Sequence, residues 1–376
     1  MTGTVRLVTT PAGDPAWQVA GYDLVRQLLV DPRLGRGHPD PAHAPRYSRS
    51  VLFGRAAKAG QDTLGPLRKV LNQWLSANRL AEMRPRVERL TDGVLADLTA
   101  HRPPVDFHEV VSFPLPALVI CEMLGVPYGD RSTFRSWCDD AANTADEQRS
   151  IAGLGALWTY MRSLVDGKLA DPERDVLTDL VALHLSDPAG CSLEQVTQLA
   201  VGLLFAGHET TVAAIDRGTV LLLTNPGEMR LLRDDPTRVR GFVEEVLRLP
   251  LPPPIRPDGE TVGGVPRFAN EDIEIGGSLV RAGELVLLDL TSSNIDPDAF
   301  TAPRRLDPAR SEGSHLTFGH GRHFCSGAAL ARIELESVFS RLVRGHPTLR
   351  LAVALESLQL RGERLAGGLV ELPVQW

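Results

Sequence analysis

The sequence predicts a mainly α protein with a minor β portion, organised as a single domain over residues 1–376. Three observations favour this class. Apolar residues recur at helical spacing over most of the chain, and clear alternation of apolar and polar residues is confined to short stretches near its end. No internal repeat, long charge run or low-complexity linker divides the sequence. With 43% hydrophobic residues, the chain can bury a sizeable core.

The first half of the chain predicts short and medium helices. VRQLLV begins a short helix that stops at Pro32, and the stretch 66–100 predicts two helices in succession. PLPALVICEMLGVP, residues 114–127, predicts a buried helix. It ends at Gly125 and Pro127, because glycine favours the position after a helix and proline cannot continue one.

A much longer helix is predicted from Ser192 to about Leu223. Ser192 and Gln195 have the spacing of a capping box, and Asn225 opens a helix-ending Asn-Pro-Gly. At 1.5 Å per residue, such a helix would be roughly 48 Å long. A helix of this length in a globular protein must cross the whole molecule.

Strand signals are fewer and lie near the end of the chain. DIEIGGSLVRAGELVLLDL, residues 272–290, alternates and carries glycine turn signals. TLRLAVAL and GLVELPVQW, residues 348–355 and 368–376, are expected to complete a small sheet.

Composition excludes several classes of protein. The net charge of −7 and the pI of about 5.8 argue against nucleic-acid binding. MTGTVRLVTTPAGDPAW has no apolar core of a signal peptide, and the most apolar stretch, 199–207, is too short to span a bilayer. A cytoplasmic protein without a membrane segment is therefore expected. Cys121, Cys138 and Cys191 are not closely spaced, so we expect ordinary thiols without disulfides.

The fourth cysteine stands in an unusual setting, the loop FGHGRHFCSG of residues 318–327. The glycines alone could mark a hairpin, and Cys325 with the nearby histidines could bind zinc, but the spacing of a structural zinc site is missing. Cys325 directly precedes a predicted helix, where free N–H groups favour a thiolate and lower its pKa. Gly319, Gly321 and Gly327 would let the backbone approach a flat ligand. The loop therefore indicates an iron-binding thiolate.

Two further motifs lie ahead of this loop. EEVLRLP contains Glu245 and Arg248, which at i, i+3 share one face of a helix, although such pairs are common on surface helices. LLFAGHETTVAAI places Glu209 and Thr210 in the middle of the long apolar helix. These polar residues could mark a face turned to solvent, but a charge inside an apolar helix is costly unless it has a function.

The spacing of the cysteine loop resembles a known signature. Phe318, Gly321, Cys325 and Gly327 match the F-x-x-G-x-x-x-C-x-G haem-binding motif of the cytochrome P450 family. The polar stretch of the long helix resembles the family motif A-G-x-[DE]-T-[TS]. The E-x-x-R pair lies between the two, in the family's order, and the resemblance covers nearly the whole chain.

The resemblance implies a cytochrome P450 fold, in which a long central helix crosses over haem b. Cys325 would be the thiolate ligand of the iron, as the family's cysteine is. Ala206 would leave room above the haem, and the acid–alcohol pair Glu209–Thr210 would relay protons to the oxygen. His323, Arg68 and Arg267 match positions whose cations hold the haem propionates. Phe318, Gly319 and Gly327 would contact the cofactor.

This chain also departs from the family pattern. Leu64 stands where a histidine is expected, and Ile295 replaces an arginine in SSNIDPDAF. In the family, Glu245 and Arg248 would form a structural pair with a further cation. The sequence leaves Arg304, Arg305 and Arg310 open for that role. The stretch of residues 249–264, LPLPPPIRPDGETVGG, is longer than the matching stretch of the family pattern. It is expected near the substrate pocket.

The function implied by the resemblance is that of a haem-thiolate monooxygenase. It would insert one oxygen atom from O2 into a small organic substrate, as a hydroxyl or epoxide, in secondary metabolite biosynthesis. Electrons would come from NAD(P)H through a separate ferredoxin and ferredoxin reductase, with Arg322 and Lys69 as docking candidates. Three alternatives stay open: oxidative C–C or C–O coupling, a peroxide-driven or dehydrating relative, and a non-catalytic haem sensor. Glu209–Thr210 argues against the last two, because neither needs a proton relay.

Overall fold

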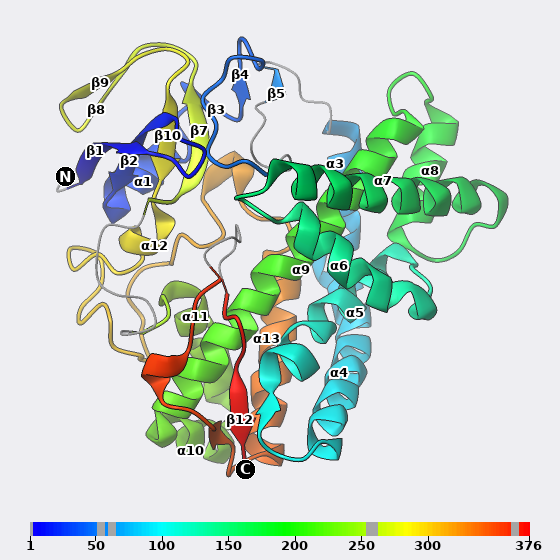
Figure 1. Ribbon diagram of the computed structural model, residues 1–376, viewed down its shortest axis with the longest axis vertical. Helices are drawn as coiled ribbons and strands as arrows, with labels where there is room; N and C mark the ends of the chain where they lie inside the picture. Colours follow the sequence, from blue (N-terminus) through cyan, green and yellow to red (C-terminus); the bar gives the residue numbers. More distant parts are fainter. Residues whose placement is uncertain (1–2, 51–56, 59–64, 253–261, 362–367) are drawn as a thin grey trace.

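The computed structural model describes residues 3–50, 57–58, 65–252, 262–361 and 368–376. Helices form the larger part of the molecule, and a smaller β portion lies to one side of them (Figure 1). The N-terminal strands and the yellow strands of residues 265–288 lie together in that portion. The predicted mainly α architecture with a minor β portion is confirmed.

The described helices follow the predicted ones closely. Residues 66–100 form two helices, separated by a short break, and Gly125 ends the buried helix in the left-handed conformation with φ of 70°. The helices are α1 (Tyr22–Leu28), α3 (Gly65–Trp74), α4 (Ala77–Ala100), α5 (Pro114–Leu124), α6 (Arg131–Ala141), α7 (Glu147–Ala170), α8 (Val176–Ser186), α9 (Leu193–Thr224), α10 (Pro226–Asp234), α11 (Val239–Arg248), α12 (Leu290–Ser293) and α13 (Ala328–Gly345).

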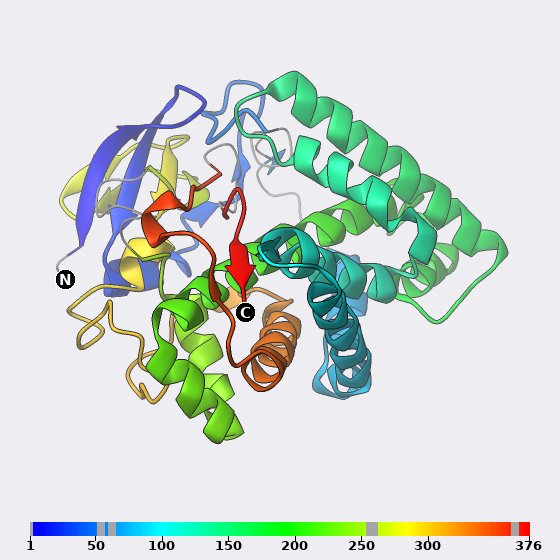
Figure 2. The same cartoon turned by 60° about the horizontal axis from the view of Figure 1, so that its bottom comes forward.

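Helix α9 is the long central helix and has 32 residues. Its capping box is formed: the Gln195 N–H donates to Ser192 Oγ (3.2 Å), and the Ser192 N–H donates to Gln195 Oε1 (2.8 Å). It packs against α5, α7, α8 and α13 and runs through the middle of the molecule (Figures 1 and 2). Among the described helices, α9 alone has the length and apolarity to cross a membrane. Its most apolar window is 61% buried within the protein, as in the core helix of a soluble protein.

The β portion is larger than predicted. Its main sheet has the order β1-β2-β10-β7-β3, in which β10 pairs parallel to β2 and the other neighbours pair antiparallel. The strands are β1 (Thr4–Thr9), β2 (Pro15–Ala20), β3 (Leu34–Gly35), β4 (Gly37–His38), β5 (Ala57–Lys58), β6 (Val105–Asp106), β7 (Val265–Ala269), β8 (Ile273–Ile275), β9 (Ser278–Val280), β10 (Leu285–Leu288), β11 (Arg350–Leu351) and β12 (Pro373–Gln375).

The two C-terminal segments pair with each other as expected, but they do not join the strands of residues 272–290. β11 pairs with β12, and β6 pairs with the other edge of β12, so the three strands form a separate sheet. The hairpin β1–β2 and the strand β7 were not predicted. Strand β6 was not predicted either. It has only two residues, too few for an alternation signal, and β7 takes its partners from other segments of the chain.

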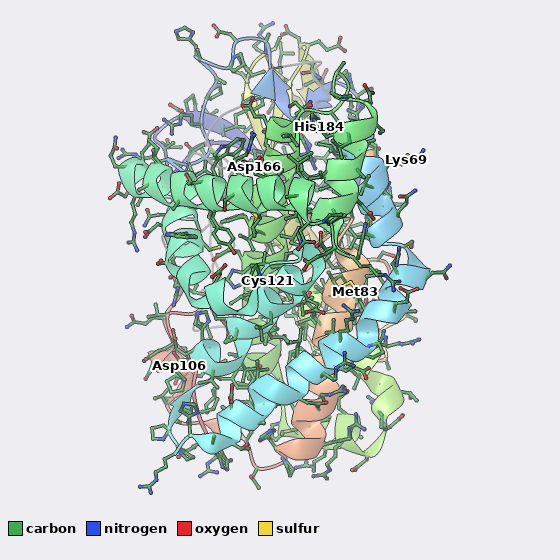
Figure 3. All side chains as sticks on the ribbon, turned by 90° about the vertical axis from the view of Figure 1, so that its right-hand side faces the viewer. Lys69, Met83, Asp106, Cys121, Asp166 and His184 are labelled. Atoms are coloured by element: carbon green, nitrogen blue, oxygen red, sulfur yellow. The ribbon has the colours of Figure 1, made fainter. Side chains whose placement is uncertain are left out.

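The two portions have separate hydrophobic cores. The large core joins helices α3 to α11 and α13, and Cys121 lies within it (Figure 3). A smaller core packs α1 against the main sheet. Cys121, Cys138 and Cys191 are buried, and none of them forms a disulfide with a described residue, whereas Cys325 is exposed.

Candidate active site

The cysteine loop is a tight turn that leads into α13. The Cys325 N–H donates to the Phe318 carbonyl (2.8 Å), and the Phe324 N–H donates to the Gly321 carbonyl (2.9 Å). Gly319 and Gly321 have φ of 74° and 69°, a region that side chains with a Cβ rarely adopt. These bonds close the loop and leave the Cys325 side chain at the start of the helix.

Gly327 differs from the other two glycines. Its φ of −79° is open to any residue, and a Cβ there would lie 3.8 Å from Cys325 Sγ, an ordinary contact. The protein itself therefore does not require glycine at this position. A flat ligand that lies against the first turn of α13 would require glycine there, since a side chain at residue 327 would occupy the space of the ligand.

The helix start does favour the Cys325 thiolate, but the expected net lowering of the Cys325 pKa is wrong. Burial of the thiol raises its pKa, and this effect outweighs the N–H groups of Gly327 and Ala328 and the charge of Arg332. Cys325 nevertheless is an exposed residue, so its remaining surface is open to a ligand. The two N–H groups and the arginine supply the stabilisation that a metal-bound thiolate would use.

Helix α9 has one exposed stripe within its buried middle. Gln198, Gly202, Ala206 and Thr210 are exposed, four residues apart, while their neighbours in the helix are mostly buried. The Thr210 hydroxyl donates to the Ala206 carbonyl (2.9 Å) along this stripe. Glu209 is only 7% exposed, so the predicted alternative of a helix face turned to bulk solvent does not hold for the carboxylate.

Thr211 completes the polar stretch. Its hydroxyl is 3.2 Å from the Gly207 carbonyl, and the residue is buried. Two successive hydroxyls thus bond to carbonyls one turn back, an arrangement that often bends a helix. The exposed one of the two, Thr210, can turn from its carbonyl toward a ligand without breaking the core.

A cluster of cations gathers three predicted residues that are distant in sequence. Burial, followed by the charges of four surrounding arginines, lowers the pKa of His323 to about 4. Burial and then the charges of Arg36 and Arg322 lower the pKa of Arg267 to about 10. The cluster consists of Arg36, Arg68, Arg267, Arg322 and His323.

Within this cluster, Arg267 gives the strongest indication of a negatively charged ligand. It is 3% exposed, its Nη1 donates to the Pro266 carbonyl (2.8 Å), and no carboxylate of the described part of the chain pairs with it. A buried guanidinium without an acid is costly unless a ligand supplies the negative charge. Arg36 was not predicted; its only sequence signal is its position between two glycines after a short strand.

These features fit a haem. A thiol open to a ligand, an exposed stripe on a buried helix and a cluster of cations around the buried Arg267 match the needs of that cofactor, whose two propionates require positive partners. The zinc alternative finds no support within the described residues, where no three histidine, cysteine or acidic side chains gather as metal ligands. His315 instead points its Nε2 at Glu244 Oε2 (3.2 Å).

The Glu245–Arg248 pair is buried and forms a network. Arg248 Nε and Nη2 donate to the two oxygens of Glu245 at 2.6 and 2.9 Å. Of the three arginines that the sequence left open, Arg310 joins the pair, with its Nε 3.3 Å from Glu245 Oε1 and its side chain 7% exposed. Arg305 contributes only its backbone carbonyl to the network. Its exposed side chain pairs with Asp307 instead.

The replacement of the family arginine by Ile295 is accommodated by the backbone. Arg248 Nη1 donates to the carbonyls of Asn294 (2.9 Å) and Pro303 (2.5 Å). The Asn294 side chain then accepts from the Leu316 N–H (2.6 Å) and donates to Thr317 Oγ1 (2.8 Å). This network ties α11 to the segment before the cysteine loop without the missing side chain.

Two sequence expectations fall outside the described residues. Leu64, which replaces the expected histidine, lies just before α3, and most of the longer stretch 249–264 lies in the undescribed range 253–261. Its predicted place beside a substrate pocket stays a prediction.

Known proteins resemble this chain along most of its length. Residues 160–346 match the family model described as Cytochrome P450. Pentalenolactone synthase of Streptomyces exfoliatus is 37% identical, over 96% of this chain and 91% of its own. The cytochrome P450 monooxygenase PikC of Streptomyces venezuelae is 34% identical, over 100% of this chain and 88% of its own.

A solved structure extends the likeness to the fold. The mycinamicin VIII C21 methyl hydroxylase MycCI of Micromonospora griseorubida superimposes with a TM-score of 0.87 at 32% identity, over 99% of this chain and 94% of the other. This chain thus resembles these P450 proteins in sequence and in fold along almost its full length. The chain therefore belongs to the cytochrome P450 family and is a haem-thiolate monooxygenase, an oxidoreductase.

Proposed function

We propose that this P450 oxidises a small natural product late in its biosynthesis, by hydroxylation or epoxidation. The observation that carries the proposal is the exposed stripe of α9, which presents Thr210 beside the buried Glu209 while Cys325 stands open at the start of α13. The names of the relatives support the substrate class: pentalenolactone synthase, and MycCI, a mycinamicin VIII C21 methyl hydroxylase.

Each site residue has a proposed role. Cys325 would bind the iron, and Phe318, Gly319 and Gly327 would border the haem on the same side. Arg267, His323 and Arg68 would hold the propionates, together with Arg36. The haem, when bound, supplies the chemistry of oxygen activation. On the side of α9, Ala206 would leave space for oxygen. Glu209 would take up a proton from water, and the Thr210 hydroxyl would pass it on to the oxygen.

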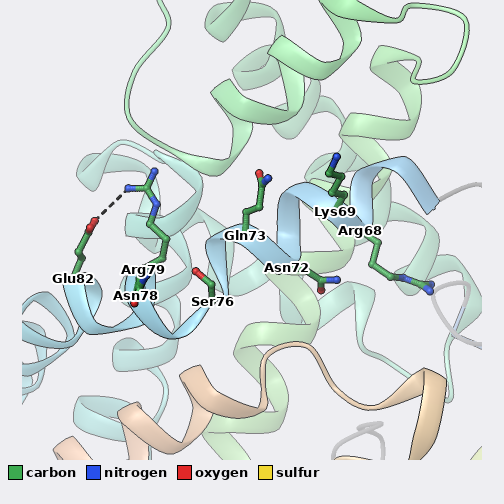
Figure 4. A pocket seen from close by; sticks show the side chains of 8 residues that line it. All are labelled: Arg68, Lys69, Asn72, Gln73, Ser76, Asn78, Arg79 and Glu82. Atoms are coloured by element: carbon green, nitrogen blue, oxygen red, sulfur yellow. Dashed lines mark hydrogen bonds and ion pairs between the residues drawn. The ribbon is translucent and has the colours of Figure 1, made fainter.

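Electrons would come from NAD(P)H through a ferredoxin reductase and an acidic ferredoxin in the cytoplasm. A shallow groove of about 730 Å³ along α3 and the start of α4 supports this proposal (Figure 4). Lys69 projects from the outer edge of α3 (Figure 3), and Arg79 lies farther along the groove. The one acid in the groove, Glu82, is paired with Arg79 (3.2 Å) and Arg174 (3.0 Å), so the surface keeps a positive excess.

Replacing Thr210 by alanine tests the proposed oxidation. Haem and substrate binding should stay nearly unchanged, because neither needs the hydroxyl. Product formed per NAD(P)H consumed should fall, with peroxide taking up the difference, since a positioned acid–base group typically contributes about 10²–10⁴-fold. The measurement is the ratio of product to NAD(P)H with a surrogate ferredoxin system. Thr211→Ala is the matched control, because its buried hydroxyl is bonded within the helix.

An unchanged ratio in Thr210→Ala would show that this hydroxyl does not take part in proton delivery. Complete absence of turnover in the parent, with any electron source and a substrate that shifts the haem spin state, would instead favour the haem sensor. These two results separate the residue's role from the function itself.

The docking groove gives a prediction on ionic strength. Turnover at limiting ferredoxin should fall as salt rises, because charged surfaces more than about 10 Å apart are screened at 0.1 M. Lys69→Gln should lower the low-salt rate and flatten its salt dependence. Arg281→Gln removes an exposed charge that pairs with Asp272 beside the hairpin β8–β9, and it should leave both unchanged. A rate that is indifferent to salt in the parent would contradict electrostatic docking.

A further inference from the structure

A second charged cluster lies beside the cysteine loop. Arg332, in the second turn of α13, forms a bidentate ion pair with Glu244 of α11: Nε lies 2.6 Å from Oε1 and Nη2 lies 2.9 Å from Oε2. The Arg332 guanidinium also stacks over the Phe318 ring, and its Cζ lies 4.7 Å from the ring centroid. The ion pair therefore fixes a full positive charge against a ring of the cysteine loop.

His315 lies close to the same Glu244 oxygen, Oε2, that Arg332 Nη2 contacts. The Thr317 N–H lies 3.3 Å from His315 Nδ1, which makes Nδ1 the acceptor and leaves the ring proton on Nε2. That Nε2 lies 3.2 Å from Glu244 Oε2. After burial, which acts in the opposite direction, the bonds from Arg332 and His315 are the main causes that lower the pKa of Glu244 to about 2. Glu244 is therefore ionised throughout the range in which the enzyme works.

Arg332 is tied to the first turn of α13 beside Cys325. Its Nη1 lies 3.4 Å from the Ala328 carbonyl, and the Ala328 N–H lies 3.3 Å from the Cys325 carbonyl. Its positive charge therefore acts in the direction that favours a thiolate at Cys325. The other acids of the adjoining cavity, of about 280 Å³, are engaged with other cations: Glu245 with Arg248 and Arg310, Glu312 with Arg310, and Asp307 with Arg305. Within the described residues, Glu244 is thus the acid that compensates Arg332 by direct contact.

We infer that Glu244, acting through Arg332, sets the electron-donating strength of the Cys325 thiolate and with it the reduction potential of the haem. This inference deepens the proposed function and rests on Cys325 being the iron ligand. A positive charge near the sulfur withdraws electron density and stabilises the reduced haem, which carries one more electron. Glu244 offsets that charge, so the pair keeps the potential lower than an uncompensated Arg332 would.

Neutralising each partner of the ion pair, singly and together, tests this inference. In purified holoenzyme at low ionic strength, the midpoint potential is measured by spectroelectrochemical titration. Glu244→Gln leaves Arg332 uncompensated and should shift the potential to a more positive value. Arg332→Gln leaves Glu244 uncompensated and should shift it to a more negative value. The double variant should return close to the parent, and Arg332→Lys, which keeps the charge, should lie nearer the parent than Arg332→Gln.

A purely structural role predicts a different result, because loosening the loop by either single change would move the potential in the same direction. Such a common shift, or a shift in Glu244→Gln no larger than in the control Glu336→Gln, would overturn the inference. Glu336 lies one turn beyond Arg332 on α13 and pairs with Arg84 (2.9 Å). If Arg332→Gln fails to hold haem, the sign of the Glu244→Gln shift alone decides. A parent whose reduced CO complex lacks the thiolate band would refute Cys325 ligation itself, a separate result.

Discussion

Replacing Cys325 by alanine is expected to abolish product formation with every electron source. The reduced, CO-treated parent should show the strongly red-shifted Soret band of a thiolate-bound haem, and the variant should lack it. The physical reason is that the thiolate donates the electron density that favours cleavage of the O–O bond, and alanine offers no ligand at all. The measurement is the CO difference spectrum together with substrate turnover.

The matched control is Cys191→Ala, which removes a buried thiol just before α9. Burial raises the pKa of Cys191, which favours the neutral thiol. The control should keep the spectrum and the activity and lose only a small part of the free energy of unfolding. A red-shifted band that survives in Cys325→Ala would assign the ligand to another residue, and zinc in place of haem in the purified parent would end the proposal.

Replacing Arg248 by methionine is expected to destabilise the protein severely. The change keeps the side-chain volume but leaves Glu245 buried beside Arg310 and removes the donor to three backbone carbonyls. Removing one partner of a buried ion pair typically costs about 3–5 kcal/mol, a large share of the roughly 5–15 kcal/mol that stabilise a folded protein. The measurement is the unfolding midpoint of the holoenzyme, with soluble yield as a second readout.

The same measurement tests which arginine completes the network. Arg310→Gln should also lower the unfolding midpoint strongly, because its side chain is buried against Glu245. Arg305→Gln should change it little, because the side chain is 69% exposed and an exposed pair is worth about 0–1 kcal/mol. Equal effects of the two changes would contradict the assignment of Arg310.

Much of the fold could be predicted because its signals are local. The capping box of α9, its 32 residues and the left-handed Gly125 at the end of α5 depend only on neighbours within a few positions. The β portion was predicted less well. The parallel pairing of β2 with β10 joins residues 17–19 to residues 286–288, and no local pattern encodes such a partner.

The family, the cysteine loop and the order of the three motifs could be predicted from the sequence, since each motif is a short run whose geometry follows from its own spacing. The residues that these motifs contact became known only from the folded structure. It selected Arg310 for the buried network, added Arg36 to the cations around Arg267, and joined Glu244 to Arg332. It also reversed the expected direction of the Cys325 pKa, because burial outweighs the helix start. Contacts and burial of this kind depend on packing between elements far apart in the chain, which spacing along the sequence does not record.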